Sequence, residues 1–201
     1  MNYLGNAGQL LIDTVFGLAM LTVLLRILMQ GARADFYNPI CQFIHRLTQP
    51  VIAPLRRFVP PLGRIDSAAV LVLLALSWLR YLVLKATVGG TVMPFINIGS
   101  AGPMALLVAA IAHILALLAM LWFWLLLISI VLSWIQPANR SPAIPLVFQL
   151  TEPLLAPFRR LLPQMGLDLS PLFAFIGIQL ARLLLIQPLY DLAARMAMPM
   201  A

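Results

Sequence analysis

The chain has 201 residues, of which 63% are hydrophobic and only 9% are charged. A soluble domain usually carries charge on about a quarter of its residues, so water is not the main solvent of this chain. The net charge of +7 comes without an aromatic-interleaved basic domain, and we expect no direct nucleic-acid binding. Because Cys41 is the single cysteine, an intrachain disulfide and a cysteine-based metal cluster are excluded.

Four apolar stretches are long enough to cross a hydrocarbon core of about 30 Å. Lipid offers no partner to backbone amides, so each stretch is predicted to be a helix. The first is expected to remain as an anchor, because no Lys or Arg precedes it and it is too long for the core of a signal peptide. The four stretches lie at about residues 10–30, 67–88, 103–135 and 169–190.

The loops between these stretches differ in charge. The loops at 30–66 and 136–168 are basic, whereas the loop at 89–102 carries no charge. Two spans separate the basic loops, so both lie on one side, and the positive-inside rule makes that side cytoplasmic and places both termini outside. The loop arginines are Arg33, Arg46, Arg56, Arg57, Arg64, Arg140, Arg159 and Arg160.

The two basic loops repeat one motif. Residues 47–60 read LTQPVIAPLRRFVP and residues 150–163 read LTEPLLAPFRRLLP. After a gap of one residue, Asp66 and Arg80 match Asp168 and Arg182. The sequence therefore predicts an all-α integral membrane protein of about four spans, built as two parallel helix-loop-helix repeats. We expect the repeats at 1–90 and 103–201, joined by an outer linker at 91–102.

Each basic loop is predicted to contain an amphipathic segment that lies on the membrane surface. In the first loop a short helix is expected between Asn38 and Thr48, and Pro50 and Pro54 are expected to end its regular hydrogen bonding and bend the chain. The second loop repeats this plan. Apolar residues recur at helical spacing on one face of the first segment: Ile40, Phe43, Ile44 and Leu47.

The repeated motif is a candidate docking surface for protein or lipid. Prolines at fixed spacing imply a defined shape, which topology signalling does not require. The alternative, that the loops only set topology and anchor helix ends on anionic lipid, stays open. The candidate docking residues are Thr48, Pro50, Pro54, Arg56, Arg57, Pro60, Thr151, Glu152, Pro153, Pro157, Arg159, Arg160 and Pro163.

Two arginines lie inside spans, Arg80 and Arg182, each about eight residues from the outer end of its span. An arginine at a helix centre costs roughly 2.5 to 3.5 kcal/mol on insertion scales, so each needs an explanation. Asp13 is the best candidate partner for Arg80, and His113 is the ionisable residue at comparable depth for Arg182. A structural helix contact, snorkelling and a functional role all remain open.

The remaining polar residues have simpler interpretations. Arg26 and Lys85 lie near helix ends, where snorkelling is the ordinary explanation. Asp66 and Asp168 each precede a span and are expected to cap it. The acids are scattered, and no catalytic constellation or phosphate-binding glycine loop is evident, so we expect no enzyme, no cofactor and no metal site.

The doubled motif resembles the bacterial YggT family, also called YlmG, which has relatives in chloroplasts. The copies differ in that Gln49 stands where the second has Glu152, and Ala68 where it has Pro171. The resemblance implies a multi-pass protein of the cytoplasmic (inner) membrane without established catalysis. It also implies links to osmotic-stress tolerance and ion homeostasis, and through relatives to cell division, nucleoid organisation and membrane-protein assembly.

Two functional hypotheses follow. In the first, the protein is a membrane scaffold or assembly factor whose loops dock lipid or an unidentified membrane or cytoplasmic protein, in support of envelope stress tolerance. In the second, it is a subunit of an ion channel or transporter with Arg80 and Arg182 on the path. The second requires a homo-oligomer, because the chain has few spans.

Overall fold

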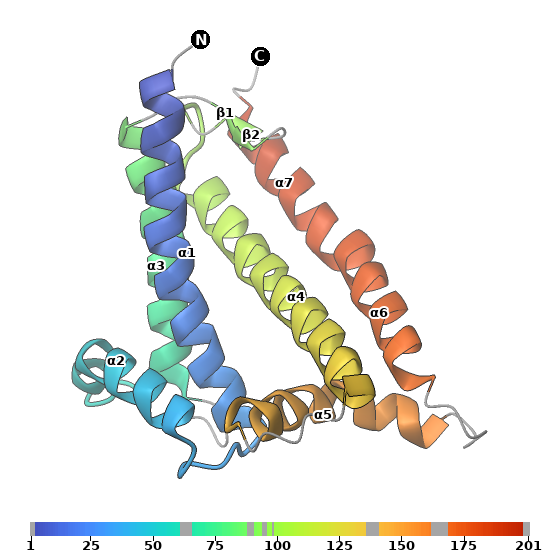
Figure 1. The fold of residues 1–201 in the computed structure, drawn as a ribbon. Helices are drawn as coiled ribbons and strands as arrows, with labels where there is room; N and C mark the ends of the chain where they lie inside the picture. Colours follow the sequence, from blue (N-terminus) through green and yellow to red (C-terminus); the bar gives the residue numbers. More distant parts are fainter. Residues whose placement is uncertain are drawn as a thin grey trace.

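The computed structural model describes residues 3–60, 66–87, 91–93, 96–97, 99–135, 141–161 and 169–198. Long helices run between two ends of the molecule, and shorter helices lie across one of them (Figure 1). We call the end with α2 and α5 the loop end, and the end with both termini the terminal end. The elements are α1 (Tyr3–Gly31), α2 (Pro39–Leu55), α3 (Ser67–Thr87), β1 (Thr91–Met93), β2 (Ile96–Asn97), α4 (Pro103–Ile135), α5 (Ala143–Leu161), α6 (Ser170–Ala181), η1 (Arg182–Ile186) and α7 (Gln187–Ala197).

Within the described part of the chain, four helical segments are long and apolar enough to span a membrane, as the sequence predicts. The last runs without a break through α6, η1 and α7, and so extends past the expected end at residue 190. Many of their leucines and valines are exposed, for example Leu10, Leu18 and Leu184. Such surfaces suit lipid, because apolar side chains there do not face water. The segments are Gly5–Gly31, Ser67–Thr87, Pro103–Trp134 and Ser170–Ala197.

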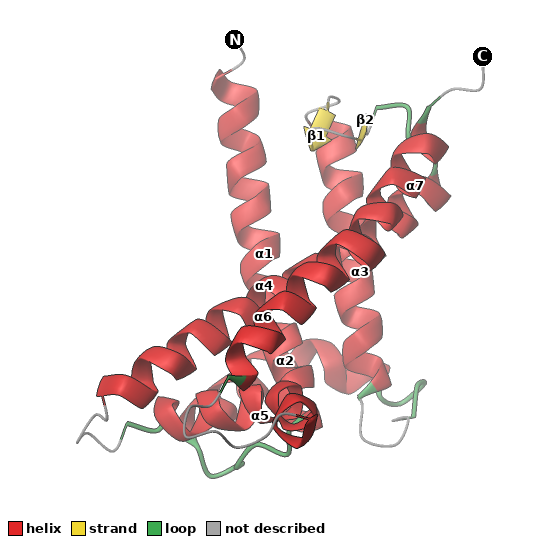
Figure 2. Ribbon diagram, turned by 90° about the vertical axis from the view of Figure 1, so that its right-hand side faces the viewer, coloured by secondary structure: helices red, strands yellow, loops and turns green. Residues whose placement is uncertain are grey.

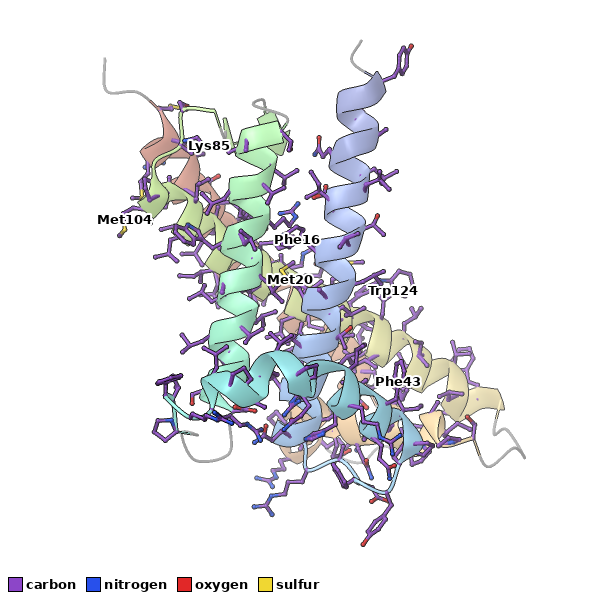
Figure 3. The ribbon with its side chains drawn as sticks, turned by 90° about the vertical axis from the view of Figure 1, so that its left-hand side faces the viewer. Phe16, Met20, Phe43, Lys85, Met104 and Trp124 are labelled. Carbon is purple, nitrogen blue, oxygen red and sulfur yellow. The ribbon has the colours of Figure 1, made fainter. Side chains whose placement is uncertain are left out.

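The spans pack in an order that follows the chain. Helix α1 packs on α3, α3 on α4, and α4 on α7. Helices α4, α6 and α7 are inclined relative to α1 and α3 (Figure 2). Met20 is fully buried between α1 and α3, whereas Phe43 lies on α2 at the loop end (Figure 3). The buried apolar residues therefore form separate clusters along the spans, and one of these clusters continues beneath α2 and α5.

The expectation that the motif prolines end the loop helix is wrong. Helix α2 continues through Pro50 and Pro54, and α5 continues through Pro153 and Pro157. The two prolines of each helix are spaced by about one turn and therefore lie on the same face. That face is exposed in both helices. The carbonyls that lose an amide partner lie four residues earlier on the same face, where surrounding solvent can bond to them. The prolines therefore leave the buried face of each helix intact.

The prediction of which residues form the apolar face of α2 is also only partly correct. The face that packs inward consists of Cys41, Ile44, Thr48 and Ile52. Three large apolar side chains point outward instead, at 64%, 54% and 53% exposure for Phe43, Leu47 and Val51. Helix α2 therefore has two apolar faces, one against the bundle and one without a partner among the described residues.

The last span contains a feature that the sequence analysis did not predict. A π-helical turn, η1, covers Arg182–Ile186, and the N–H of Gln187 bonds to the carbonyl of Arg182. Pro188 follows at the start of α7 and cannot donate a backbone hydrogen bond. A wide turn before a proline is a known way to relieve its clash with the preceding turn. The first repeat has a regular α-helix at the corresponding Arg80.

The terminal end is closed by polar contacts to backbone. Lys85 Nζ donates to the carbonyl of Ala101 at 2.7 Å, so its role is a tie to the linker and not simple snorkelling. Ser100 Oγ donates to the carbonyl of Ala197 at 2.6 Å. Strands β1 and β2, also not predicted, pair antiparallel with Thr91 opposite Asn97 and Met93 opposite Ile96. These contacts join the ends of α3, α4 and α7.

Candidate functional site

Arg26 forms the centre of a buried polar contact at the loop end. Its side chain is 4% exposed, and its Nη1 donates to Thr48 Oγ1 at 2.6 Å and to the carbonyl of His45 at 3.4 Å. Its Nη2 donates to Gln49 Oε1 at 3.0 Å. The expectation that Arg26 snorkels into solvent is therefore wrong. Because Arg26 lies on α1 and its acceptors lie on α2, the contact holds the loop helix against the span.

Asp66 supplies the counter-charge. It is 1% exposed and lies 3.8 Å from Arg26 Nη2, and it also pairs with Arg56, whose Nε donates to Asp66 Oδ2 at 3.0 Å. Asp66 Oδ1 accepts from the N–H of Ala69 at 3.4 Å, which confirms the predicted cap of α3. Burial acts to raise the pKa of Asp66, but Arg56, the Ala69 amide and Arg26 together hold that pKa below its usual value.

The second repeat does not reproduce this cluster. The constant offset of 103 places Ser129 at the position of Arg26, and Ser129 Oγ donates to the carbonyl of Leu126 within its own helix. Glu152 pairs with Arg159 at 2.6 Å on the exposed face of α5. Asp168, the counterpart of Asp66, lies outside the described residues. Within the described part, the buried arginine-aspartate contact therefore belongs to the first repeat.

The thirteen predicted docking residues divide into inward and outward groups. Thr48 and Thr151 are buried, and Arg56 turns toward Asp66, so these three side chains have structural contacts. Arg57 and Arg160 are exposed and form no ion pair with any described residue. Pro163 lies outside the described residues. The others are exposed: Pro50, Pro54, Pro60, Glu152, Pro153, Pro157 and Arg159.

The two loop regions contact each other directly, which sequence reasoning missed. Asn38 Nδ2 donates to the carbonyl of Pro142 at 2.6 Å, and the N–H of Asp35 donates to Gln149 Oε1 at 3.2 Å. Below these contacts, α1, α2, α4 and α5 share one apolar cluster that includes Ile44 and Leu150. The two repeats therefore present their loop helices as one surface.

The intramembrane pairing predicted for Arg80 is present. Arg80 is 5% exposed, and its Nη2 lies 2.7 Å from Asp13 Oδ1, with Asp13 34% exposed. Arg80 Nε also donates to this oxygen at 2.9 Å. The ion pair joins α1 to α3 well inside the spans, where an isolated arginine is costly.

Further polar side chains gather around this pair. The Arg80 guanidinium lies 5.0 Å from the centre of the Tyr81 ring, and Tyr81 contacts the His113 ring edge to face at 6.1 Å. Tyr190 of α7 packs against the same cluster. The Tyr81 hydroxyl interacts with both Arg80 and the Tyr190 hydroxyl, whereas the buried Nδ1 of His113 has no hydrogen bond to a described residue. Side chains from α1, α3, α4 and α7 thus meet in one polar cluster.

Arg182 does not join its proposed partner. His113 lies beside Tyr81, whereas Arg182 is exposed on η1 and has no hydrogen bond or ion pair to a described residue. The two arginines that the repeat aligns therefore have different surroundings. The second repeat has Leu115 and Ala116 where the first has Asp13, so the acid that pairs with Arg80 has no counterpart for Arg182. Among the described residues, no group of three His, Cys, Asp or Glu side chains could hold a metal ion.

Comparison with known proteins supports one relationship. The family described as CCB3/YggT matches twice, at residues 6–87 and 108–189. The chain is 41% identical to an uncharacterized protein of Pseudomonas aeruginosa over 98% of this chain and 95% of that protein. It is 43% identical to the uncharacterized protein YggT of Escherichia coli over 83% and 82% of the two chains. An uncharacterized protein of Vibrio alginolyticus is 45% identical over 90% and 94%. No solved structure matches.

Proposed function

Because the chain belongs to the CCB3/YggT family, we propose that it is a membrane scaffold or assembly factor of the bacterial inner membrane. Its paired loop helices dock lipid or another protein at the cytoplasmic face and thereby support envelope and osmotic-stress tolerance. The proposed orientation rests on the positive-inside rule, since arginines gather in the loops that contain α2 and α5.

The observation that carries the proposal is the double-sided form of α2 beside α5. Phe43, Leu47 and Val51 form an outward apolar row, each one helical turn from the next. Arg57 follows this row at the end of α2, and Arg160 lies at the end of α5. An apolar row with adjacent cations suits the boundary between lipid headgroups and acyl chains. The hydrogen bonds between the two loop regions hold both helices as one unit.

Removing the exposed loop charges should weaken this function without unfolding the protein. We expect Arg57→Gln with Arg160→Gln to lower the survival of cells on hyperosmotic medium when the variant replaces the wild-type gene. Each arginine near an anionic membrane surface contributes about 1 kcal/mol, so the pair should weaken docking by roughly tenfold or more. Growth rate against osmolarity measures the effect, with the amount of inserted protein checked by immunoblot.

Arg195→Gln is the matched control, because Arg195 is an exposed arginine at the terminal end. Its growth should equal that of the wild type. Equal loss of growth in both variants, or normal growth of the double loop variant, would contradict docking through the loop end.

A second candidate function is an ion pathway, favoured by the polar cluster around Arg80. The buried Nδ1 of His113 has no hydrogen bond to a described residue, which is costly inside a membrane unless water or an ion reaches it. Polar side chains that face a bundle interior are also common along ion paths. In this form of the hypothesis Arg182 is not on the path, because its side chain is exposed on η1.

Ion flux through purified protein in liposomes distinguishes this candidate. If the cluster conducts, His113→Leu and Tyr190→Phe should reduce proton or chloride flux several-fold, because each removes a polar group from the cluster. Arg182→Leu should leave the flux unchanged. Absence of wild-type flux with verified insertion, or equal loss in all three variants, would reject the pathway through the cluster.

A further inference from the structure

Beneath α2 lies a cavity of about 180 Å³ between α1, the following loop and the loop helix. Its polar wall contains Arg26, Gln30, His45 and Arg56, and its apolar wall includes Met29 and Phe36. Arg26 is almost fully buried, so one cation of this wall is fixed in place by the fold.

The charges in this wall do not cancel. Arg26 and Arg56 share a single carboxylate, that of Asp66, which leaves about one positive charge beside the cavity. Asp35 does not line the cavity, and its Oδ1 accepts from the N–H of Tyr37. Its negative charge acts on Cys41 in the cavity wall, but it is not among the charges that shift the pKa of His45. The pKa of His45 is consistent with this excess of positive charge. Burial, Arg26 and Arg56 lower that pKa, and Asp66 only partly opposes them.

Hydrogen-bond donors also remain available. Arg56 uses Nε and Nη2 for Asp66, so its Nη1 has no described partner. The His45 ring contacts Phe36 edge to face at 5.6 Å and lines the cavity, and its ring nitrogens have no hydrogen bond to a described residue. A guanidinium and an imidazole beside an uncompensated positive charge are the groups that bind phosphate oxygens.

We propose that this cavity binds a phosphate group, with Arg56 and His45 as the direct donors and Arg26 as the fixed charge behind them. The apolar wall beside the cations favours the phosphate of an anionic phospholipid headgroup, whose glycerol and first acyl carbons contact Met29 and Phe36. This inference deepens the proposed docking function and rests on it for the lipid as the source of phosphate. The alternative source is free inorganic phosphate.

The test uses the full-length protein in a phosphate-free maltoside detergent. The probes are short-chain phosphatidylglycerol and inorganic phosphate in separate titrations. The readout is the NMR titration of His45, which is one of only two histidines in the chain and is assigned with His45→Asn. A bound phosphate should raise the pKa of His45, because its negative charge stabilises the imidazolium.

Two variants and one control locate the site. Arg56→Gln should weaken binding about tenfold or more, because it removes a charge-assisted donor. Gln30→Glu should do the same without disturbing Asp66, because it adds a negative charge at the exposed rim. Arg46→Gln is the matched control: Arg46 is exposed on α2 and does not line the cavity, so binding should change less than twofold.

An effect of phosphatidylglycerol alone identifies the lipid headgroup as the source, and an equal effect of inorganic phosphate identifies the free ion; both support the site. The proposal is overturned if neither probe moves the His45 titration in folded protein, or if Arg46→Gln weakens binding as much as Arg56→Gln. Because Arg57 and Arg160 are outside the cavity, failure of the stress experiment with intact phosphate binding would reject only the scaffold function.

Discussion

Asp66→Asn should destabilise the protein by about 3 kcal/mol. The substitution keeps the size of the side chain and its ability to cap α3, but it removes the carboxylate that Arg26 and Arg56 share. Removing one partner of a buried ion pair costs about 3 to 5 kcal/mol, because the other charge stays buried without compensation. Arg56, at 39% exposure, can turn toward water, so the loss falls on Arg26. Reversible unfolding in mixed micelles measures the change in free energy of unfolding.

Glu152→Gln is the matched control, because it removes a carboxylate charge from an exposed ion pair. Glu152 and Arg159 are 56% and 42% exposed, and exposed pairs contribute about 1 kcal/mol or less. The stability difference between the two variants should therefore exceed about 2 kcal/mol. Equal effects would show that Arg26 is compensated by its bonds to Thr48 and Gln49 and not by Asp66.

The contact of Asp66 with Arg26 and Arg56 also makes the free energy of unfolding depend on pH. The folded-state pKa of Asp66 is lowered, so its contribution is fully present above the unfolded-state pKa, near 3.9. That contribution is lost as the pH falls through the lower folded-state pKa. The wild type should therefore lose more stability than Asp66→Asn between about pH 5 and pH 2.

Sequence reasoning located the spans and the repeat because both depend on patterns that are local in the chain. Long apolar stretches fix the helices, and the predicted third span coincides with α4 at Pro103–Ile135. The pairing of Arg80 with Asp13 could also be predicted from the sequence. Few acids lie within the spans, so the expected depth in the membrane was enough to identify Asp13 as the candidate partner.

The contact of Arg26 with Asp66 could not be predicted from the sequence, because it depends on how α2 folds back against α1 and α3. One signal was present. The copies differ both at Arg26 against Ser129 and at Gln49 against Glu152, and the structure brings Arg26 and Gln49 together. In the second repeat Glu152 instead pairs with Arg159. When two positions that differ between the repeats lie in contact in the structure, they indicate an interaction that only one repeat has.

Asp13→Leu should also destabilise the protein by about 3 kcal/mol, because it leaves Arg80 charged and 5% exposed inside the membrane. The double variant Asp13→Leu, Arg80→Leu should recover most of that loss, since replacing both partners of a buried pair by apolar residues is often neutral. Unfolding in mixed micelles of the wild type, both single variants and the double variant gives a coupling free energy, which should exceed about 2 kcal/mol.

The double variant also separates the two functions considered for the polar cluster. It is expected to be folded, yet it lacks the charged pair between α1 and α3. If the cluster only joins the helices, cells with this variant should tolerate osmotic stress as the wild type does, because the loop surface is unchanged. If the cluster conducts ions, the variant should lose flux in liposomes despite normal stability. A stable variant that keeps both flux and stress tolerance would assign Arg80 and Asp13 a purely structural role.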